Sequence, residues 1–314
     1  MTQPNLLVIG SLNMDIVVQT ARYPLVGETI TGENVHFIPG GKGANQAIAA
    51  ARLGAETAMI GAVGQDAFGE NLLHSLEKEG VDVSGIKQVA GVATGVASIY
   101  IAEGDNSIVV VPGANNRLEF ADIDRNEALL RQADIVLLQL EIPEETVLYA
   151  ASKAKIFGKT VVLNPAPAKP IPDELFQLAD YITPNRTELG RYTGMETDGS
   201  SLGFAMQRMK EIGEAHIVTT LGSAGSAYIA DDGSIQTIPG HKVPVVDTTG
   251  AGDCYNAGLA ISIATGRSLE EAVNFASLVS ALAVTKFGAQ AGMPTIAEVR
   301  AFEAERNKTG ADQA

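Results

Sequence analysis

The sequence predicts an α/β fold: a mostly parallel sheet with helices on both faces, arranged in three α/β/α layers, and a small antiparallel β lid. Short β-rich runs alternate with helical patterns over most of the 314 residues, which is typical of βαβ units. Two stretches break this alternation: residues 14–38 are extended without a helix, and residues 95–113 form two strand-like runs joined by the turn-rich EGDN. We expect these stretches to pair outside the main sheet, as a lid whose apolar face suits a homodimer contact.

The elements of the main body follow from local patterns. The first helix is predicted from Ala44, Ala47, Ile48 and Ala51, whose i, i+3, i+4, i+7 spacing forms one apolar face, and Gly54 ends it. Strands are expected at 6–10, 57–63, 134–140, 160–163, 181–183 and 216–220, and further helices near 144–157, 173–179, 200–212, 269–287 and 295–304. The expected parts are an α/β catalytic domain (1–13, 39–94 and 114–304), a β lid (14–38 and 95–113) and a flexible tail (305–314).

Composition and charge exclude several classes of protein. With 46% hydrophobic and 19% charged residues, the chain is expected to be globular, not disordered, collagen-like or a coiled coil. Its 22 basic and 37 acidic residues give a net charge of -15, which argues against a nucleic-acid partner. An anionic ligand must therefore be held locally, by backbone dipoles, a few cations or a metal.

Cysteine content and the N-terminus indicate the compartment. Cys254 is the only cysteine, so the sequence has neither an internal disulfide nor a cysteine-built metal site. The start, MTQPN, lacks the basic and apolar regions of a leader, and no stretch approaches about 18 uninterrupted apolar residues. We expect a cytoplasmic protein with no membrane partner.

The most informative segment is VVDTTGAGDCYNAG at residues 245–258. A β-rich run ends in Asp-Thr-Thr and passes through a Gly-Ala-Gly turn into an amphipathic helix, so the amides of Gly250, Ala251 and Gly252 are expected to face one spot that suits a phosphoryl group. Asp253 at its rim is a candidate proton acceptor for a substrate hydroxyl. The alternative is an ordinary acidic residue in the first turn of a helix.

Two better-known phosphate motifs are absent. Gly158-Lys159-Thr160 lacks the Gly that a Walker loop has five positions earlier, where Lys153 stands, and it leads into a strand. A dinucleotide fingerprint needs a third Gly where this chain has Gln46 or Tyr255. A Walker-type nucleotide site and a Rossmann dehydrogenase are therefore disfavoured.

A second constellation joins GSLNMD at 10–15 to PGGKGANQAIAAARLGA at 39–55. Asn13 and Asp15 follow the first strand, at the edge where open α/β sheets bind ligands. Glycines before the helix permit close backbone approach, while Lys42 and Asn45 supply donors. Carboxylate, amide and glycine together suit a polyhydroxylated ligand, and ordinary turn chemistry is the alternative.

Together these segments resemble ribokinases, within the phosphofructokinase B family of carbohydrate kinases. The resemblance runs in order over nearly the whole chain, and the pairing of a Gly-Gly-Lys-Gly segment near the start with DTTGAGD near the end is its specific part. The matching segments are GSLNMD (10–15), GGKGANQAIAAARLGA (40–55), VGQDAFGE (63–70), LNPAPA (163–168), TPNRTE (183–188), TLGSAG (220–225), DTTGAGD (247–253) and KFGAQAGMP (286–294).

The resemblance implies roles for matching positions. Asp253 matches the catalytic base, with Gly250, Ala251 and Gly252 at the anion hole; the pentose hydroxyls would contact Asn13, Asp15, Gly41, Lys42, Gly43, Asn45, Glu141 and Asp253. ATP with Mg2+ would be handled by Asn185, Glu188, Thr220, Gly222, Ser223, Gly225, Gly252 and Ser277. A K+ site, mostly of backbone carbonyls, would use Asp247, Thr249, Ala283, Lys286, Gly288 and Gly292; ribokinases often have Ser at the last position, so Gly292 offers only a main-chain oxygen or a water.

Some residues keep a second interpretation. Glu188 suits a helix-surface carboxylate, Lys42 a solvated turn cation, and Cys254 a small buried residue. The histidines show no metal-ligand spacing and are interpreted as structural. Met14 suits lid packing, or contact with the ligand's apolar face that biases the choice between ribose and deoxyribose.

The resemblance thus implies ATP-dependent phosphorylation of a primary sugar hydroxyl, with D-ribose as the first choice. The alternatives are a kinase of the same family for deoxyribose, fructose, a keto-deoxy sugar acid or a nucleoside, and, from another class, a catalytically silent sugar-binding regulatory protein.

Overall fold

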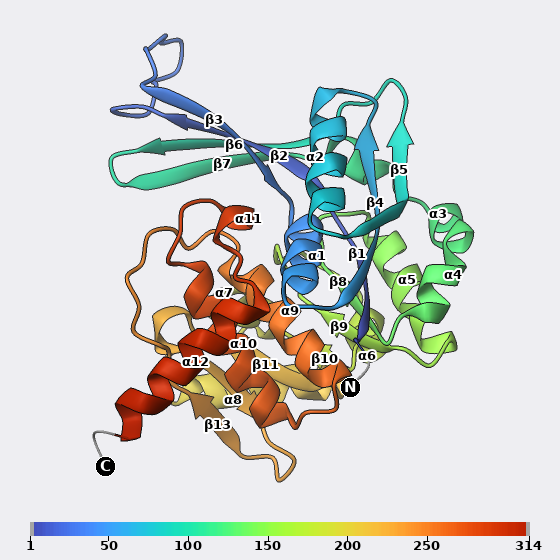
Figure 1. Cartoon of the computed structure of the whole chain (residues 1–314), viewed down its shortest axis with the longest axis vertical. Helices are drawn as coiled ribbons and strands as arrows, with labels where there is room; N and C mark the ends of the chain where they lie inside the picture. Colours follow the sequence, from blue (N-terminus) through green and yellow to red (C-terminus); the bar gives the residue numbers. More distant parts are fainter. Residues whose placement is uncertain (1–2, 312–314) are drawn as a thin grey trace.

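The computed structural model describes residues 3–311 and has two sheets (Figure 1). The larger sheet has nine strands in the spatial order β13 (Ile235–Ile238), β12 (Ser226–Ile229), β11 (His216–Thr220), β10 (Tyr181–Ile182), β9 (Thr160–Leu163), β8 (Ile135–Leu138), β1 (Asn5–Ile9), β4 (Glu56–Gly64) and β5 (Asp82–Val89). All pairs from β11 to β5 are parallel, and β12 and β13 add two antiparallel strands at one edge. The predicted mostly parallel sheet is confirmed.

Both faces of this sheet are buried under helices, because its apolar strands alternate their side chains between two cores. In β1, Leu7 and Ile9 join the core under α3 (Phe120–Arg125), α4 (Glu127–Gln132), α5 (Glu144–Ile156), α6 (Asp173–Leu178), α7 (Arg186–Thr193) and α8 (Ser201–Gly213). Leu6 and Val8 join the core under α1 (Lys42–Arg52), α2 (Ala67–Lys78), α9 (Ala251–Ala264), α10 (Leu269–Ala283) and α12 (Ile296–Ala311). The three-layer prediction is therefore confirmed.

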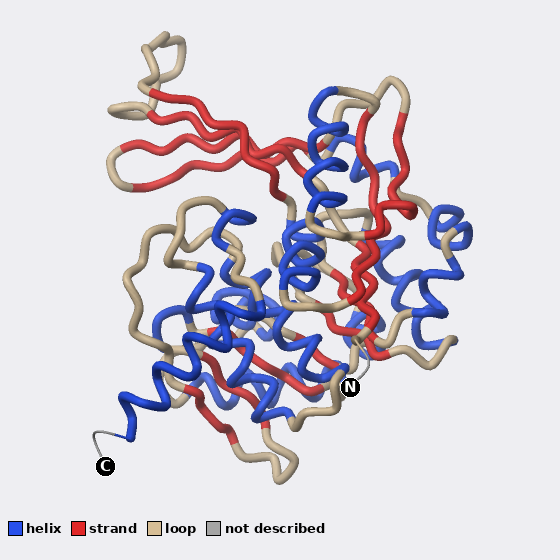
Figure 2. The backbone as a smooth tube through the Cα atoms, viewed as in Figure 1, coloured by secondary structure: helices blue, strands red, loops and turns tan. Residues whose placement is uncertain are grey.

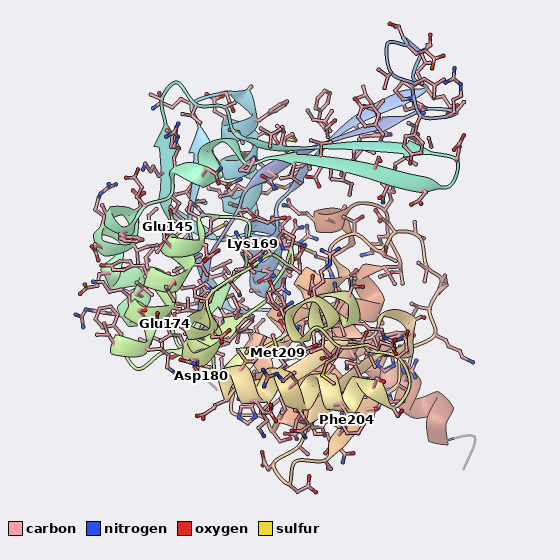
Figure 3. All side chains as sticks on the ribbon, turned by 180° about the vertical axis from the view of Figure 1, so that it is seen from behind. Glu145, Lys169, Glu174, Asp180, Phe204 and Met209 are labelled. Carbon is pink, nitrogen blue, oxygen red and sulfur yellow. The ribbon has the colours of Figure 1, made fainter. Side chains whose placement is uncertain are left out.

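Helix α8 shows how one helix serves both core and surface. Met209 is fully buried against the sheet, whereas Phe204 on the outer side is 67% exposed (Figure 3).

Among the helices of residues 3–311, none combines the length and the apolar character that crossing a bilayer requires.

The second sheet is the lid, with the order β3 (Asn34–Gly40), β2 (Asn13–Gln19), β6 (Gly95–Ala102) and β7 (Asp105–Val111). It projects from the body above the α11 region (Ala289–Gly292), as Figure 2 and Figure 1 show. Both hairpins are antiparallel, as predicted, and they join through a parallel pair, β2 with β6, because both strands enter the lid from the body in the same direction. Every residue of β7 is exposed.

Three local predictions need correction. The β-rich run before Asp247 forms no strand, and Val245 and Val246 are mostly exposed because they have no strand partner there. Helix α9 is not amphipathic: residues 253–262 are all buried, since it lies between the sheet and α10. Helix α10 ends at Ala283, where the chain turns to form the loop before α11.

The tail also differs from its prediction. Helix α12 continues to Ala311 instead of ending near residue 304, because Ala301, Glu303, Ala304 and Glu305 favour helix. The last part of the predicted tail, residues 312–314, lies outside the described residues.

Candidate active site

The site lies at the carboxyl ends of β1 and β8, where the N-termini of α1 and α9 meet. Open parallel sheets bind ligands at this edge because strand-to-helix loops converge there. The loop after β1 leads through Ser11 into the lid, and the loop after β8 carries Glu141. Glu141 holds these loops together: its Oε2 accepts hydrogen bonds from Ser11 Oγ (2.6 Å) and from the Lys42 backbone N–H at the start of α1 (3.0 Å).

Asp253 lies in the first turn of α9, which begins after Gly250 at a φ of 80°. That left-handed conformation favours glycine. Asp253 as a whole is 6% exposed, and its carboxylate accepts hydrogen bonds from Asn45 Nδ2 at Oδ2 (2.9 Å) and from Gln46 Nε2 at Oδ1 (3.1 Å). An ordinary first-turn acid would contact amides of its own helix, whereas Asp253 contacts α1.

Burial raises the pKa of Asp253 above its ordinary value, because water no longer solvates the charge. The Lys42 ammonium and the two amide donors counter this by favouring the ionised form, and Glu141 adds to the rise. A carboxylate with a raised pKa, held ionised by nearby donors, is suited to accept a proton.

Lys42 is the cation of a cluster that is otherwise acidic. Burial lowers the pKa of its ammonium, but Asp253, Glu141, Glu188 and Asp15 together raise it above its ordinary value. The ammonium therefore stays charged among carboxylates, and the interpretation of a solvated turn cation does not hold.

Asp15 on β2 completes this cluster from the lid side, beside the backbone of Gly40. Burial raises the pKa of Asp15 to about 7, with Glu141 and Asp253 adding to the rise and Lys42 opposing it. Asn13, in the same strand, is buried and its Oδ1 accepts from Asn115 Nδ2 (2.8 Å). Carboxylates and amides thus face one region from the body and from the lid.

The glycines of this region are required by close backbone contacts. Gly41 has a φ of 92°, and an added Cβ would lie 2.7 Å from the Asn13 backbone nitrogen. At Gly43 an added Cβ would lie 2.6 Å from the Ser11 nitrogen. The segment therefore brings α1 against the end of β1, which is the close approach that the sequence predicted.

A separate cavity of about 280 Å³ adjoins the other side of the α9 N-terminus. Of the residues predicted for the nucleotide, Thr220, Gly222, Ser223, Gly225, Gly252 and Ser277 line it, together with Ala251. Gly252 is exposed, and an added Cβ there would meet no atom within 4 Å. One predicted amide is not free, however, because Ala251 N–H donates to the Thr248 carbonyl (3.2 Å) as the helix begins.

Asn185 and Glu188 lie outside the lining of that cavity and cap α7 reciprocally. Asn185 Oδ1 accepts from the Glu188 N–H (2.8 Å), and Glu188 Oε2 accepts from the Asn185 N–H (2.8 Å). Burial raises the pKa of Glu188, while Lys42 lowers it and Asp253 raises it, so the side chain interacts electrostatically with the site. Asn185 pairs with Thr220 across an isolated parallel bridge, which brings this cap beside the cavity wall.

The residues predicted for K+ come together in one loop cluster. Asp247 Oδ1 accepts from Thr249 N and Oγ1 (2.9 and 2.7 Å), and its Oδ2 accepts from Gly288 N (2.9 Å). A Cβ added at Gly292 would lie 2.6 Å from the Ala283 oxygen and 3.6 Å from the Lys286 oxygen, so these carbonyls adjoin Gly292. The Lys286 ammonium is paired with Glu298 (2.8 Å), which leaves its carbonyl as the group at the cluster. Backbone carbonyl oxygens can replace the hydration shell of K+, so these residues could hold such an ion.

No group of three or more His, Cys, Asp or Glu within the described part of the chain could hold a metal ion. Mg2+ needs no such group, because it is usually bound by one or two carboxylates together with substrate phosphates and waters. Cys254 is buried, and burial raises the pKa of its thiol, as expected for a packing residue. Met14 is also buried, in the core under α1, which favours packing over ligand contact.

The sequence prediction missed several polar residues of the site. Gln46, Gln139, Asn164 and Asn115 are all at least nine-tenths buried and hydrogen-bonded around Asp253 or Asn13. The available signal was positional: Gln139 and Asn164 each directly follow a buried strand, at the ligand-binding edge of the sheet.

Comparisons with known proteins agree with this geometry. The model of the pfkB family carbohydrate kinases matches residues 3–296. A ribokinase of Haemophilus influenzae is 41% identical, covering 95% of this chain and 97% of that protein, and a deoxyribokinase of Salmonella typhimurium is 35% identical, covering 95% and 98%. The structure of an Arabidopsis thaliana ribokinase complexed with ribose and ATP superposes with a TM-score of 0.90 at 36% identity, covering 95% of this chain and 98% of that one.

Proposed function

Because the chain belongs to the pfkB family of carbohydrate kinases, we propose that it transfers the γ-phosphoryl group of ATP to the primary 5-hydroxyl of D-ribose, giving ribose 5-phosphate and ADP. The position of Asp253 carries this proposal. Its carboxylate is buried beside Lys42 and Asn45, while the adjacent Gly252 lines the 280 Å³ cavity. One step along α9 therefore connects a cluster suited to sugar hydroxyls with a cavity suited to a nucleotide.

In the proposed reaction Asp253 accepts the proton of the sugar hydroxyl. The hydroxyl oxygen attacks the γ-phosphorus in line, the bond from that phosphorus to the bridging oxygen breaks, and its electron pair leaves on ADP. The N-terminus of α9, with the Gly250 and Gly252 amides, faces the charge that develops on the phosphoryl oxygens. A preorganised donor of this kind typically contributes about 3 kcal/mol.

The sugar would be held by the cluster on its two sides. Asn13 and Asp15 would contact it from the lid, and Glu141 and Lys42 from the body, with the Gly41 and Gly43 backbone close by. Each hydroxyl both donates and accepts, so mixed carboxylates, amides and an ammonium suit several hydroxyls at once. One N–H of the Asn45 side chain donates to Asp253, and its oxygen accepts from Gln290. The second N–H of Asn45 is therefore available to donate to a sugar hydroxyl.

Two cations complete the proposal. Mg2+ bound to the ATP phosphates would lie toward Asn185 and Glu188 and would neutralise phosphate charge. K+ would be held by Asp247 and by the oxygens of Thr249, Ala283, Lys286, Gly288 and Gly292. Asp247 and Thr249 lie directly before the anion hole, and Asp247 also accepts from Gly288 N, so these contacts fix the backbone of residues 247–250.

The lid, residues 14–38 and 95–113, would close over the sugar and exclude water. Its outer strand β7 exposes Ile108, Val109, Val110 and Val111 to solvent, and Phe37 on β3 is also exposed. Contiguous exposed apolar residues of this kind favour a partner surface. We therefore propose a homodimer through the lid sheet, and a cytoplasmic location because the reaction consumes ATP.

The test is ADP release with D-ribose, deoxyribose, fructose, a keto-deoxy sugar acid and a nucleoside, each with and without K+. We expect the highest kcat/KM with ribose, stimulation by K+, and a product whose phosphorus signal couples to the C5 protons. The Asp253→Asn variant should lose roughly 10²-fold or more in turnover while still binding ATP. If kcat/KM is highest with deoxyribose, the substrate is that of the 35%-identical Salmonella typhimurium deoxyribokinase and the proposal of ribose is refuted. Near-normal turnover of Asp253→Asn would refute the assignment of Asp253 as the base.

A further inference from the structure

We infer that Gln139 and Gln290 are positioning residues for the base: each fixes the direction of a second amide, and that amide donates to one oxygen of Asp253. This inference rests on the proposed function, since it takes Asp253 as the proton acceptor. It concerns two residues that lie outside the predicted sugar, nucleotide and metal contacts.

The first relay runs from Gln139 through Gln46. Gln46 Nε2 faces two acceptors, Asp253 Oδ1 (3.1 Å) and Asn164 Oδ1 (3.2 Å). The direction of Asn164 is itself fixed, because its Nδ2 donates to the Thr183 carbonyl (3.3 Å), which can only accept. If the Gln46 amide were reversed, its oxygen would face two oxygens, so the NH2 group must point toward Asp253.

In this orientation the side-chain oxygen of Gln46 points away from Asp253 and needs a donor, which Gln139 supplies. Gln139 Nε2 donates to Gln46 Oε1 at 2.6 Å, and both side chains are fully buried. Gln139 Oε1 has no partner among the described residues, and a Cβ at Gly10 would overlap it. A buried glutamine that makes one side-chain hydrogen bond and leaves its oxygen unpaired calls for an explanation. Its single contact, the one to Gln46, provides that explanation.

The second relay reaches the other carboxylate oxygen. Gln290 Nε2 donates to Asn45 Oδ1 (3.2 Å), and Asn45 Nδ2 donates to Asp253 Oδ2 (2.9 Å). Gln290 is directed in turn by Ser75, whose Oγ donates to its Oε1 (3.2 Å). Arg52 anchors the Gln290 backbone through a bond to its carbonyl (2.6 Å). Each oxygen of the base thus receives one N–H from an amide that has a donor behind it.

Two effects follow for the base. The paired amides hold the carboxylate plane in one orientation, and the two N–H groups stabilise the ionised form against burial. Loss of either outer glutamine leaves the oxygen of the inner amide without its donor, so the inner amide is held less firmly in the orientation that donates to Asp253. The carboxylate is then both less well aimed and harder to ionise.

The test uses the neutral, similarly sized variants Gln139→Met and Gln290→Met in the full chain. We expect kcat to fall about 10-fold or more, because small misplacements of a catalytic group have large effects. KM for the sugar should change little in Gln139→Met, because Gln46 is not a proposed sugar contact, whereas Gln290→Met should also raise KM, because Asn45 is one. The acid limb of the kcat profile should move to higher pH, since a base that loses N–H donors has a higher pKa. Gln132→Met on α4, far from the site, is the matched control.

Asp253→Asn run in parallel separates the two levels of the argument. If it retains turnover, the proposed function fails and the relays have no base to position. If it loses turnover while both Met variants keep the wild-type kcat and pH profile, the relays are refuted. A Met variant that loses activity only in proportion to its folded fraction, with an unmoved pH profile, also refutes them. If Gln139→Met does not fold, Gln290→Met, which changes a residue of the short helix α11 outside the central sheet, decides the question.

Discussion

Replacing Asp15 by Asn should stabilise the folded protein at neutral and alkaline pH while weakening sugar binding. Asp15 lies on β2 with its carboxylate among Glu141, Asp253 and Lys42. Burial and the two like charges raise its pKa to about 7, whereas an unfolded chain has an Asp pKa of about 3.9. Asn has nearly the same shape and carries no charge to desolvate.

The sign follows from which state binds the proton more tightly. The folded protein holds the Asp15 proton up to about pH 7, and the unfolded chain releases it near pH 4. The favourable contribution of protonated Asp15 to folding is therefore complete below about pH 4 and is lost as pH rises to about 7. Three pKa units correspond to roughly 4 kcal/mol, which is an upper bound because part of the side chain meets water.

Urea denaturation of wild type and Asp15→Asn at several values between pH 5 and pH 8 measures this. The difference in unfolding free energy should favour the variant and grow with pH, reaching a plateau above pH 7. Asp105→Asn, at the exposed start of β7 in the lid, is the matched control and should show no such trend. A variant that is no more stable than wild type at pH 8, or a difference that shrinks as pH rises, would show that Asp15 is not a buried, destabilising charge.

Three further substitutions test separate parts of the site. Gly252→Ala should keep the wild-type thermal stability, because the added Cβ meets no atom within 4 Å. Isothermal titration should nevertheless show weaker ATP binding, because the methyl group would obstruct a phosphate close to the backbone. An unchanged affinity for ATP would exclude such a close approach. Lys42→Met should raise the pKa of Asp15 further, since it removes the one cation that opposes the rise; carboxyl NMR titration measures this, and a lower pKa would contradict the geometry. Glu188→Gln should preserve stability, because Gln also completes a capping box, while steady-state kinetics should show a lower kcat; an unchanged kcat would restrict Glu188 to the helix cap.

Much of the fold could be predicted from the sequence because it depends on local patterns. The runs at 160–163 and 216–220 coincide with β9 and β11, because short apolar segments bounded by turn residues are typical of buried strands. The run before Asp247 misled for the same reason: its residues have the composition of a strand, but no neighbouring strand is available to pair with them. Pairing is decided by the rest of the fold, and a local pattern does not contain it.

The site divides in the same way. Asp253 and the glycines before it are adjacent in sequence, so their geometry could be anticipated from one turn of helix. The amides around Asp253 could not, because Gln46 contacts a residue 207 positions away and Gln139 reaches Gln46 across 93. Polar residues at the ends of buried strands are the only sign of such a network, and many such residues merely cap turns.

The charge distribution of the site limits how the two substrates can be held. Asp15, Glu141, Glu188 and Asp253 surround one ammonium, in a chain whose net charge is -15. That environment suits a neutral polyol and repels a polyphosphate. It therefore supports the proposal that ATP is bound mainly on the other side of α9, by the helix N-terminus and the loops around the cavity. The transferring phosphoryl group nevertheless has to approach Asp253. Neutralisation of its charge by cations and by the amides at Gly250 and Gly252 is therefore a physical requirement of the proposed reaction.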